Sequence, residues 1–237
     1  MKAPAQANYG IDAPVALRRL FLAGTMGLAG GILLLRAGRP QWGAPLLSMG
    51  LPMFLTACVM VWGSKVGKLR LRDRVLASIP WRGDEAVLDV GCGHGLMLIG
   101  AARRLTTGKA VGVDIWQSED QAGNRPEATR ANAEREGVTA RGEICDGDAR
   151  ALPFPGRCFD VVASSFAVHN IYDSAGRAQA LREIVRVLKP AGCLILIDIR
   201  HTADYARVLE QCGMKEVKRS RPYFLFVNPA LLTAFKP

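Results

Sequence analysis

The stretch AVLDVGCGHG, residues 86–95, decides how this chain folds. Four apolar residues surround the single acid Asp89, and this composition is typical of a strand buried inside a parallel sheet. Glycines then occupy every second position up to Gly95, which predicts a sharp turn into a helix that begins at Leu96. Because glycine has no Cβ, a ligand can approach the backbone of such a turn closely.

The spacing of these glycines differs from that of a dinucleotide-binding loop. The sequence G-x-G-x-x-G, counted from Gly91, requires a glycine where this chain has Leu96. The glycines instead follow the order D-x-G-x-G-x-G, in which Asp89 is the acid. An oxidoreductase that uses NAD(P) is therefore the less favoured alternative.

From about residue 64 to the end, helical and strand patterns alternate, and this alternation predicts an α/β sheet. Strands are expected at 86–90, 110–115, 141–145, 159–164, 193–199, 215–219 and 231–235. Helices are expected at 68–79, 96–105, 126–136, 175–188 and 203–212.

Charge separates the N-terminal third from the rest of the chain. Residues 1–74 hold ten basic and two acidic side chains, whereas the remainder holds 21 basic and 19 acidic ones. Because the remainder is nearly neutral, no basic face is expected there, and nucleic acid is not an expected partner. The six cysteines and three histidines show no metal-ligand spacing, so we expect reduced thiols and no metal site.

The same N-terminal third contains two uncharged runs, residues 20–35 and 40–64. A membrane-spanning helix needs about 20 apolar residues, so the runs predict a two-pass hairpin with helices at about 15–35 and 41–63. Ala23, Gly27 and Gly31 have the small-xxx-small spacing that lets membrane helices pack closely, within a hairpin or between copies. A shallow in-plane hairpin and a soluble one are the alternatives.

Basic residues after the second run predict the orientation of this hairpin. Five of them lie between Lys65 and Arg74, and only Arg36 and Arg39 lie between the two runs. The positive-inside rule places both ends, and hence the following domain, in the cytoplasm. We therefore expect a membrane hairpin at 1–64 and a cytoplasmic catalytic domain at 65–237.

The second predicted strand carries a candidate binding acid near its end. Asp114 follows Gly95 by 19 residues. A carboxylate at that strand tip can accept both hydroxyls of a ribose bound across the sheet crevice. Nicotinamide enzymes use the same device, so Asp114 alone does not choose the cofactor.

Three further blocks extend the pattern: Asp148-Ala149 after the third strand, FDVV at 159–162 and VLKPAG at 187–192. With the glycine turn, they make residues 70–237 resemble class I S-adenosylmethionine (SAM)-dependent methyltransferases, a group that includes ubiquinone-biosynthesis methyltransferases. The resemblance implies a Rossmann-like sheet of order 3-2-1-4-5-7-6 with strand 7 antiparallel. It also implies SAM as the cofactor.

The resemblance further implies roles for individual residues. Asp148 would take the adenine amino group of SAM, and the Ala149 N–H would meet a ring nitrogen. Trp116 would stack on the adenine or wall the acceptor site, with plain packing as the alternative. The full set of expected cofactor-binding residues is Asp89, Gly91, Cys92, Gly93, Gly95, Asp114, Ile115, Trp116, Asp148, Ala149 and Ser165.

Three segments should converge on the acceptor at the carboxyl ends of the strands: 116–124, 164–172 and 198–201. A base is needed only if the acceptor must lose a proton, and His169 is the best candidate because imidazole titrates near neutral pH. Tyr172 and Asp198 are weaker catalytic candidates. His169 could instead cap a helix or pack beside the pocket, and Asp198 could cap the next helix or pair with Arg200.

These observations predict a membrane-anchored SAM-dependent methyltransferase. The hairpin favours a small lipophilic acceptor, such as a quinone-like ring, a lipid headgroup, a thiol or an amine. The residues leave the acceptor atom open among O, N, C and S. The alternative from a different class is a non-catalytic membrane scaffold or sensor that binds SAM.

Overall fold

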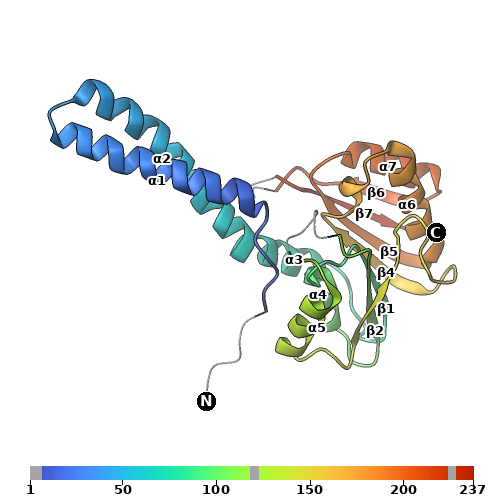
Figure 1. The fold of residues 1–237 in the computed structure, drawn as a ribbon. Coiled ribbons are helices and arrows are strands. Elements are labelled where there is room, and N and C mark those ends of the chain that lie inside the picture. The colour runs from blue at the N-terminus through green and yellow to red at the C-terminus, as the bar shows by residue number, and fades with distance from the viewer. Residues whose placement is uncertain (1–6, 118–122, 224–227) are drawn as a thin grey trace, which may run out of the picture. The chain divides into compact units, whose positions relative to one another are not determined.

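The computed structural model describes residues 7–117, 123–223 and 228–237 (Figure 1). Its contacts divide the chain into two compact units. One unit is Gly10–Lys68, and the other is Leu69–Pro237 together with the described residues of Met1–Tyr9. The second unit thus includes a short N-terminal segment that sequence reasoning assigned to the hairpin.

The first unit is a pair of helices, α1 (Pro14–Arg36) and α2 (Pro40–Trp62), followed by the π-helical turn η1 (Gly63–Gly67). Glycines let α1 and α2 approach closely. A Cβ added at Gly24 would lie 2.6 Å from the backbone N of Phe54, and one at Gly27 would lie 2.9 Å from the Cα of Gly50. The two helices therefore pack backbone against backbone.

The packing stripe differs by one residue from the predicted one. Gly24 and Gly31 are buried between the helices and Gly27 is partly buried, whereas Ala23 is exposed. Gly24 takes the predicted place of Ala23 because the spacing from Gly24 to Gly27 to Gly31 also follows one face of a helix.

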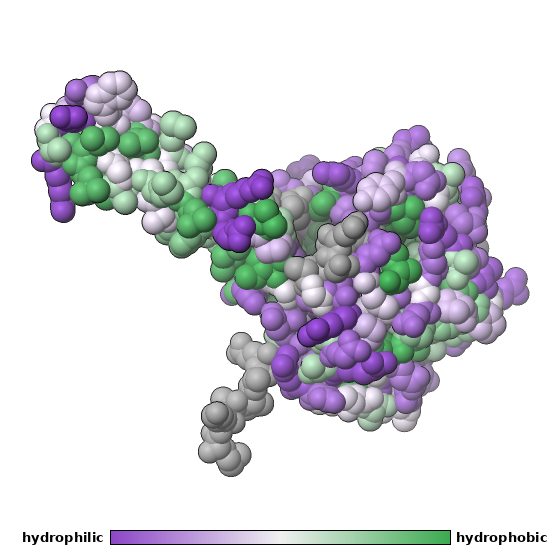
Figure 2. Space-filling view, viewed as in Figure 1, coloured by the Kyte–Doolittle hydropathy of each residue, from purple (hydrophilic) through white to green (hydrophobic). Residues whose placement is uncertain are grey.

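Much of the surface that this pair presents in Figure 2 is apolar, with hydrophilic residues at its tip. Among the described residues, α1 and the continuous helical stretch Pro40–Ala77, which begins with α2, are long and apolar enough to cross a membrane. The most apolar windows of these two stretches are 11% and 17% buried. The core helix of a soluble protein would bury most of such a window. The exposed side chains include Leu22, Met26, Leu33, Met49 and Leu55.

Replacing Gly24 with leucine is expected to separate α1 from α2, because the added Cβ has no room beside Phe54. Overpacking of this kind costs about 1–3 kcal/mol. Limited proteolysis of the detergent-solubilised chain should cut within the hairpin faster in Gly24→Leu than in the wild type. Ala23→Leu, at the neighbouring exposed position, is the matched control and should be cut at the wild-type rate. Equal protection of both variants would contradict the packing described here.

The second unit contains a seven-stranded sheet of order β3-β2-β1-β4-β5-β7-β6. β7 runs antiparallel to both of its neighbours, β5 and β6, so the predicted order and the predicted direction of strand 7 are confirmed. The strands are β1 (Ala86–Val90), β2 (Lys109–Asp114), β3 (Gly142–Asp146), β4 (Phe159–Ser165), β5 (Leu188–Asp198), β6 (Lys215–Arg219) and β7 (Ala230–Phe235).

Helices cover both faces of this sheet. The bounds are α3 (Lys68–Ala77), α4 (Leu96–Ala102), α5 (Pro126–Arg135), α6 (Ser174–Val187) and α7 (Thr202–Gln211), with a 3₁₀ turn η2 (Val168–Asn170) after β4. Side chains of α3, α4 and α5 form one buried cluster with one face of the strands. Side chains of α6 and α7 form the other cluster with the opposite face.

The fifth strand begins earlier than predicted. β5 pairs with β4 from Leu188, and the register then jumps from Phe159↔Leu188 to Val161↔Cys193. The Pro190–Gly192 segment is therefore a bulge inside the strand rather than a turn before it. The backbone of Lys236, after β7, exchanges hydrogen bonds with Ala191 and Gly192 and holds this bulge in the sheet.

Candidate functional site

The glycine turn after β1 needs glycine at two positions for different reasons. Gly91 has φ 70°, and a Cβ there would lie 2.2 Å from the Cβ of Ala167. Gly95 has φ 84° and begins α4 from a left-handed conformation. The contact at Gly91 also places the segment after β4 directly against the turn. Residues from two strand ends thus meet at the carboxyl edge of the sheet.

Side chains of α5 hold the turn from its carbonyl side. Thr129 Oγ1 donates a hydrogen bond to the Gly93 carbonyl, and Asn132 Nδ2 donates one to the His94 carbonyl at 3.0 Å. Both side chains are at most 1% exposed. Sequence reasoning missed Thr129 and Asn132, because nothing in the local pattern of a polar helix distinguishes them.

Asp114 lies at the tip of β2 and is bonded to the turn. Its carboxylate accepts hydrogen bonds from the Gly93 N–H at 2.8 Å, the Trp116 N–H at 2.7 Å and the Asn124 side-chain amide at 3.2 Å. A carboxylate has about four acceptor positions, so capacity for a further donor remains. These bonds fix the orientation of the carboxylate before any ligand arrives.

Asp89 is a buried acid without a full set of partners. One oxygen, Oδ2, accepts the Leu98 N–H at 2.8 Å, but Oδ1 has no hydrogen bond among the described residues. Burial is the main cause that raises the pKa of Asp89 from 3.8 to about 7, and the charge of Asp114 adds to it. A positively charged group next to Oδ1 would reverse this shift.

Ser165 carries a second orphaned atom on the same face of the sheet. Its Oγ is buried and makes no hydrogen bond among the described residues. Asp89 pairs in register with Ala163, two residues before Ser165, and alternate residues of a strand share one face. Two unsatisfied polar atoms on one face near neighbouring strand ends mark a place for a polar ligand.

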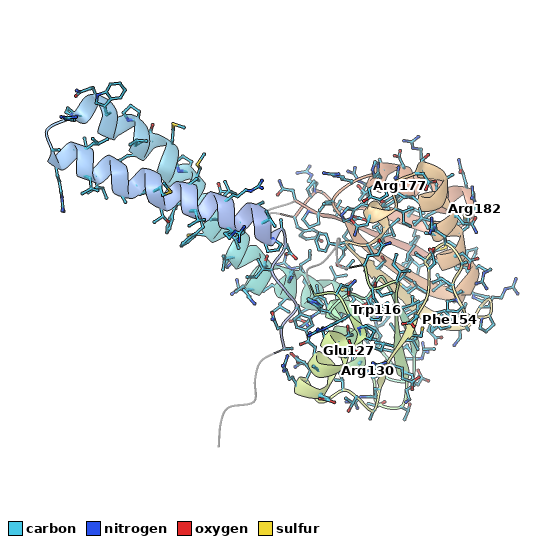
Figure 3. The ribbon with its side chains drawn as sticks, in the orientation of Figure 1. Trp116, Glu127, Arg130, Phe154, Arg177 and Arg182 are labelled. Carbon is cyan, nitrogen blue, oxygen red and sulfur yellow. The ribbon has the colours of Figure 1, made fainter. Side chains whose placement is uncertain are left out.

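The tip of β2 continues into apolar and aromatic residues. Ile115 is 49% exposed, which is unusual for a large aliphatic side chain next to a buried strand. Trp116 (labelled in Figure 3) has φ 59°, and its indole N–H donates to Asp146 at the end of β3 at 2.7 Å. Its ring is therefore tied to the sheet edge beside the site.

Asp148 comes with a partner that sequence reasoning did not foresee. Arg150 binds its carboxylate through Nε and Nη2, with Nη2 2.6 Å from Oδ2. Hydrogen bonds from Arg150 lower the pKa of Asp148, so the group is a carboxylate at neutral pH. It remains partly exposed and able to accept a further donor.

His169 and Asp198 form a pair at the ends of η2 and β5. Asp198 is 1% exposed and accepts the backbone N–H groups of His169 and Ile199. His169 Nδ1 lies 2.5 Å from Asp198 Oδ1, a close contact that is not aligned as a hydrogen bond. No hydrogen bond occupies Nε2 within the described ranges, and the side chain is 15% exposed. Asp198 can therefore orient the imidazole while Nε2 meets a ligand.

Tyr205 packs behind this pair, and Tyr172 stands apart from it. Burial and the charge of Asp198 raise the pKa of Tyr205 well above its ordinary range. Tyr172 is 93% exposed, and its carbonyl accepts a hydrogen bond from Arg177 of α6 (labelled in Figure 3). Asp198 faces His169 rather than Arg200. Of the acceptor segment predicted at 116–124, residues 118–122 lie outside the described residues.

Comparison with known proteins shows that part of this chain is similar to methyltransferases. Residues 88–196 match the family profile described as a methyltransferase domain. The chain is 36% identical over 124 residues to a demethylmenaquinone methyltransferase of Symbiobacterium thermophilum, covering 52% of this chain and 46% of that protein. It is 34% identical over 129 residues to the 27-O-demethylrifamycin SV methyltransferase of Amycolatopsis mediterranei, covering 54% and 44%. The matched part thus spans about half the length of each relative.

A solved structure shares the fold at lower identity. The crystal structure of a SAM-dependent methyltransferase from Aquifex aeolicus aligns with a TM-score of 0.57 at 18% identity, covering 77% of this chain and 98% of that chain. The predicted resemblance to class I SAM-dependent methyltransferases is confirmed by the family match, and the predicted fold is confirmed by the sheet order.

Proposed function

We propose that this chain, whose residues 88–196 form a methyltransferase domain, transfers a methyl group from SAM to a small lipophilic acceptor at a membrane. One observation carries the cofactor assignment: the glycine turn, the oriented carboxylate of Asp114 and the orphaned Oδ1 of Asp89 meet at one sheet edge. SAM has ribose hydroxyls, which are donors, and positive charge, and these residues offer the matching acceptors.

The residues present fit each part of SAM. Asp114 would accept the ribose hydroxyls, and Asp89 would face the positively charged methionine end. The exposed Ile115 would cover the adenine, and Asp148 would accept its amino group. When bound, SAM supplies an electrophilic methyl group on a sulfonium centre. The turn itself contributes close backbone approach, because Gly91 and Gly95 carry no Cβ.

Binding of SAM is expected to weaken as the pH falls below about 7, because Asp89 is then protonated in the free protein. Because the pKa of Asp89 is about 7 without ligand, we expect about one proton to be released for each SAM bound near pH 6. We also expect the affinity for SAM to fall close to tenfold for each pH unit as the pH decreases from about 7 to about 5. The raised pKa of Asp89 also affects the stability of the ligand-free protein. The contribution of protonated Asp89 to that stability is fully present below pH 3.8 and is lost as the pH rises through 7. Calorimetry at pH 6, in two buffers of different ionisation enthalpy, measures the proton release.

Asp89→Asn should bind SAM with an affinity that does not depend on pH over this range, and it should release no proton. Asp84→Asn, a change at an exposed acid just before β1, should keep the wild-type slope. A wild-type affinity that is flat between pH 5 and 7 would contradict the role of Asp89.

The acceptor we infer has an ionisable hydroxyl, as a hydroquinone does. His169 Nε2 would take the hydroxyl proton, and the buried Asp198 would stabilise the resulting imidazolium. The proximity of Ala167 to Gly91 supports this role, because Ala167 lies two residues before His169 and Gly91 belongs to the glycine turn. One of the two relatives is a demethylmenaquinone methyltransferase, and its acceptor, a quinone-related compound, is consistent with a lipophilic acceptor here.

The hairpin supports delivery of such an acceptor from lipid. Its outward surface is apolar, and it is followed by the exposed basic residues Lys65, Arg70 and Arg74. Basic side chains near an anionic membrane surface contribute about 1 kcal/mol each. We propose that α1 and α2 span the membrane and that the methyltransferase domain lies on its cytoplasmic side.

Calorimetric titration of SAM, and separately of NADH, into the detergent-solubilised chain tests the cofactor assignment. The expected result is saturable binding of SAM and none of NADH. Binding of NADH alone would overturn the proposal in favour of an oxidoreductase. Binding of SAM without transfer to any acceptor would favour the non-catalytic scaffold.

A further inference from the structure

We propose that Asn132 is a positioning residue for the glycine turn, and that the N-terminal segment 7–9 acts with it. The affinity for SAM then depends on the part of the chain that leads into the first apolar helix. This inference rests on the proposed function, because it assigns a support to the same cofactor site.

Asn132 joins two backbone segments that are far apart in the sequence. Its Nδ2 donates to the carbonyl of His94 at 3.0 Å and to the carbonyl of Asn8 at 2.9 Å, and its Oδ1 accepts the N–H of Asn8 at 2.8 Å. The side chain is 1% exposed. A buried amide with both ends satisfied by backbone groups fixes the orientation of each group that it contacts.

Tyr9 anchors the N-terminal segment in the core. Its side chain is 6% exposed and belongs to the buried cluster that includes Val75 and Met97. The guanidinium of Arg72 lies over its ring, 5.7 Å from the centroid. Burial is the main cause that raises the pKa of Tyr9 to about 12, so the phenol is neutral at physiological pH. Segment 7–9 therefore packs as part of the second unit.

The bond to His94 matters because of where that residue sits in the turn. The carbonyl of His94 belongs to the peptide that leads into Gly95, whose φ of 84° begins α4. If Asn132 releases this carbonyl, the peptide can rotate, and the backbone that faces the cofactor loses its fixed orientation. Asn132 is buried and its amide is bonded to backbone groups at both ends, so its loss should weaken SAM binding and leave the chemical step unchanged.

The chain continues from Tyr9 through Gly10 into α1. A change at the start of α1 that displaces Asn8 would therefore disturb Asn132 and, through it, the glycine turn. Sequence distance gives no hint of this connection, because Asn8 and Asn132 are 124 residues apart.

Titration of SAM into the full-length chain and its Asn132→Ala and Tyr9→Ala variants tests the proposal. We expect SAM to bind at least about tenfold more weakly to each variant, because each substitution removes buried contacts that hold Asn8 and the His94 carbonyl in place. The loss of SAM affinity in the double variant should be smaller than the product of the losses in the two single variants, because both substitutions act through the same contacts. With saturating SAM, kcat should stay within about twofold of the wild type, while the KM for SAM rises. Glu134→Ala, an exposed position on the same helix, should change nothing.

A second readout needs no cofactor. Hydrogen exchange of the Gly93–Gly95 amides in the ligand-free chain should be faster in Asn132→Ala and Tyr9→Ala than in Glu134→Ala. If Asn132→Ala does not fold, Asn132→Asp replaces it, because the aspartate keeps the acceptor for Asn8 but loses both donors. Wild-type exchange and wild-type SAM affinity in either folded variant would overturn the proposal. A wild-type chain that does not bind SAM, with faster exchange in the variants, would overturn the proposed function alone.

Discussion

Replacing Asp114 with alanine is expected to weaken SAM binding by at least about 100-fold, because hydrogen bonds to a charged group contribute about 1.5–3 kcal/mol each and a ribose offers two hydroxyls. The variant also leaves the Gly93 N–H, the Trp116 N–H and the Asn124 amide without their acceptor. The turn should therefore lose both its ligand contact and its internal support. Calorimetric titration of SAM measures the first effect, and thermal unfolding without SAM measures the second.

Asp160→Ala is the matched control for this substitution. Asp160 lies near the start of β4, at the opposite end of the sheet, where it pairs with Lys189 at 2.7 Å. Its loss should reduce stability modestly and leave SAM affinity unchanged. An Asp114→Ala variant that is folded and binds SAM within threefold of the wild type would refute the assignment of Asp114 to the cofactor.

Replacing His169 with alanine is expected to lower kcat by about 10²–10⁴-fold, which is the usual contribution of a positioned general base. The affinity for SAM should stay within about twofold, because no hydrogen bond joins the His169 imidazole to the glycine turn among the residues that the structure describes. Asp198→Asn should also lower kcat, since the amide cannot stabilise an imidazolium. The measurement is steady-state transfer of labelled methyl from SAM to a reduced naphthoquinone.

Two residues near His169 provide controls. His201→Ala removes a histidine that is 37% exposed at the start of α7, and Tyr172→Phe removes the hydroxyl of a side chain that is 93% exposed. Both variants should keep nearly wild-type kcat. A loss of less than about threefold in His169→Ala would show that the acceptor needs no base from this position.

Much of the fold follows from local pattern. The apolar strand, the glycine spacing and the alternation of helices and strands were sufficient to predict an α/β sheet, because each depends on residues within one element or one turn. The order of the strands was predicted from the resemblance to class I SAM-dependent methyltransferases. The fifth strand was expected to begin only at Cys193, because a proline and a glycine two residues apart, Pro190 and Gly192, are as typical of a turn before a strand as of a bulge inside one. Gly24 rather than the predicted Ala23 lies at the contact between α1 and α2, because the packing of the second helix determines which small residue is buried.

The site was predictable only where one residue carries the signal. Asp114 ends a strand and Gly95 closes a glycine turn, so their positions alone suggested their placement. The contacts of Thr129, Asn132 and Tyr9 join residues that are far apart in the sequence, so no local spacing predicts them. The same limit applies to Arg150, whose bond to Asp148 depends on the conformation of the turn after β3.

The most direct test of the central claim is transfer of tritiated methyl from SAM to a reduced naphthoquinone dissolved in phospholipid vesicles that contain the full-length chain. The account predicts a labelled, lipid-extractable product from the wild type, a rate at least about 100-fold lower from His169→Ala, and a wild-type rate from His201→Ala. SAM that binds tightly but transfers no methyl to any hydroxyl-bearing lipophilic acceptor would contradict the account.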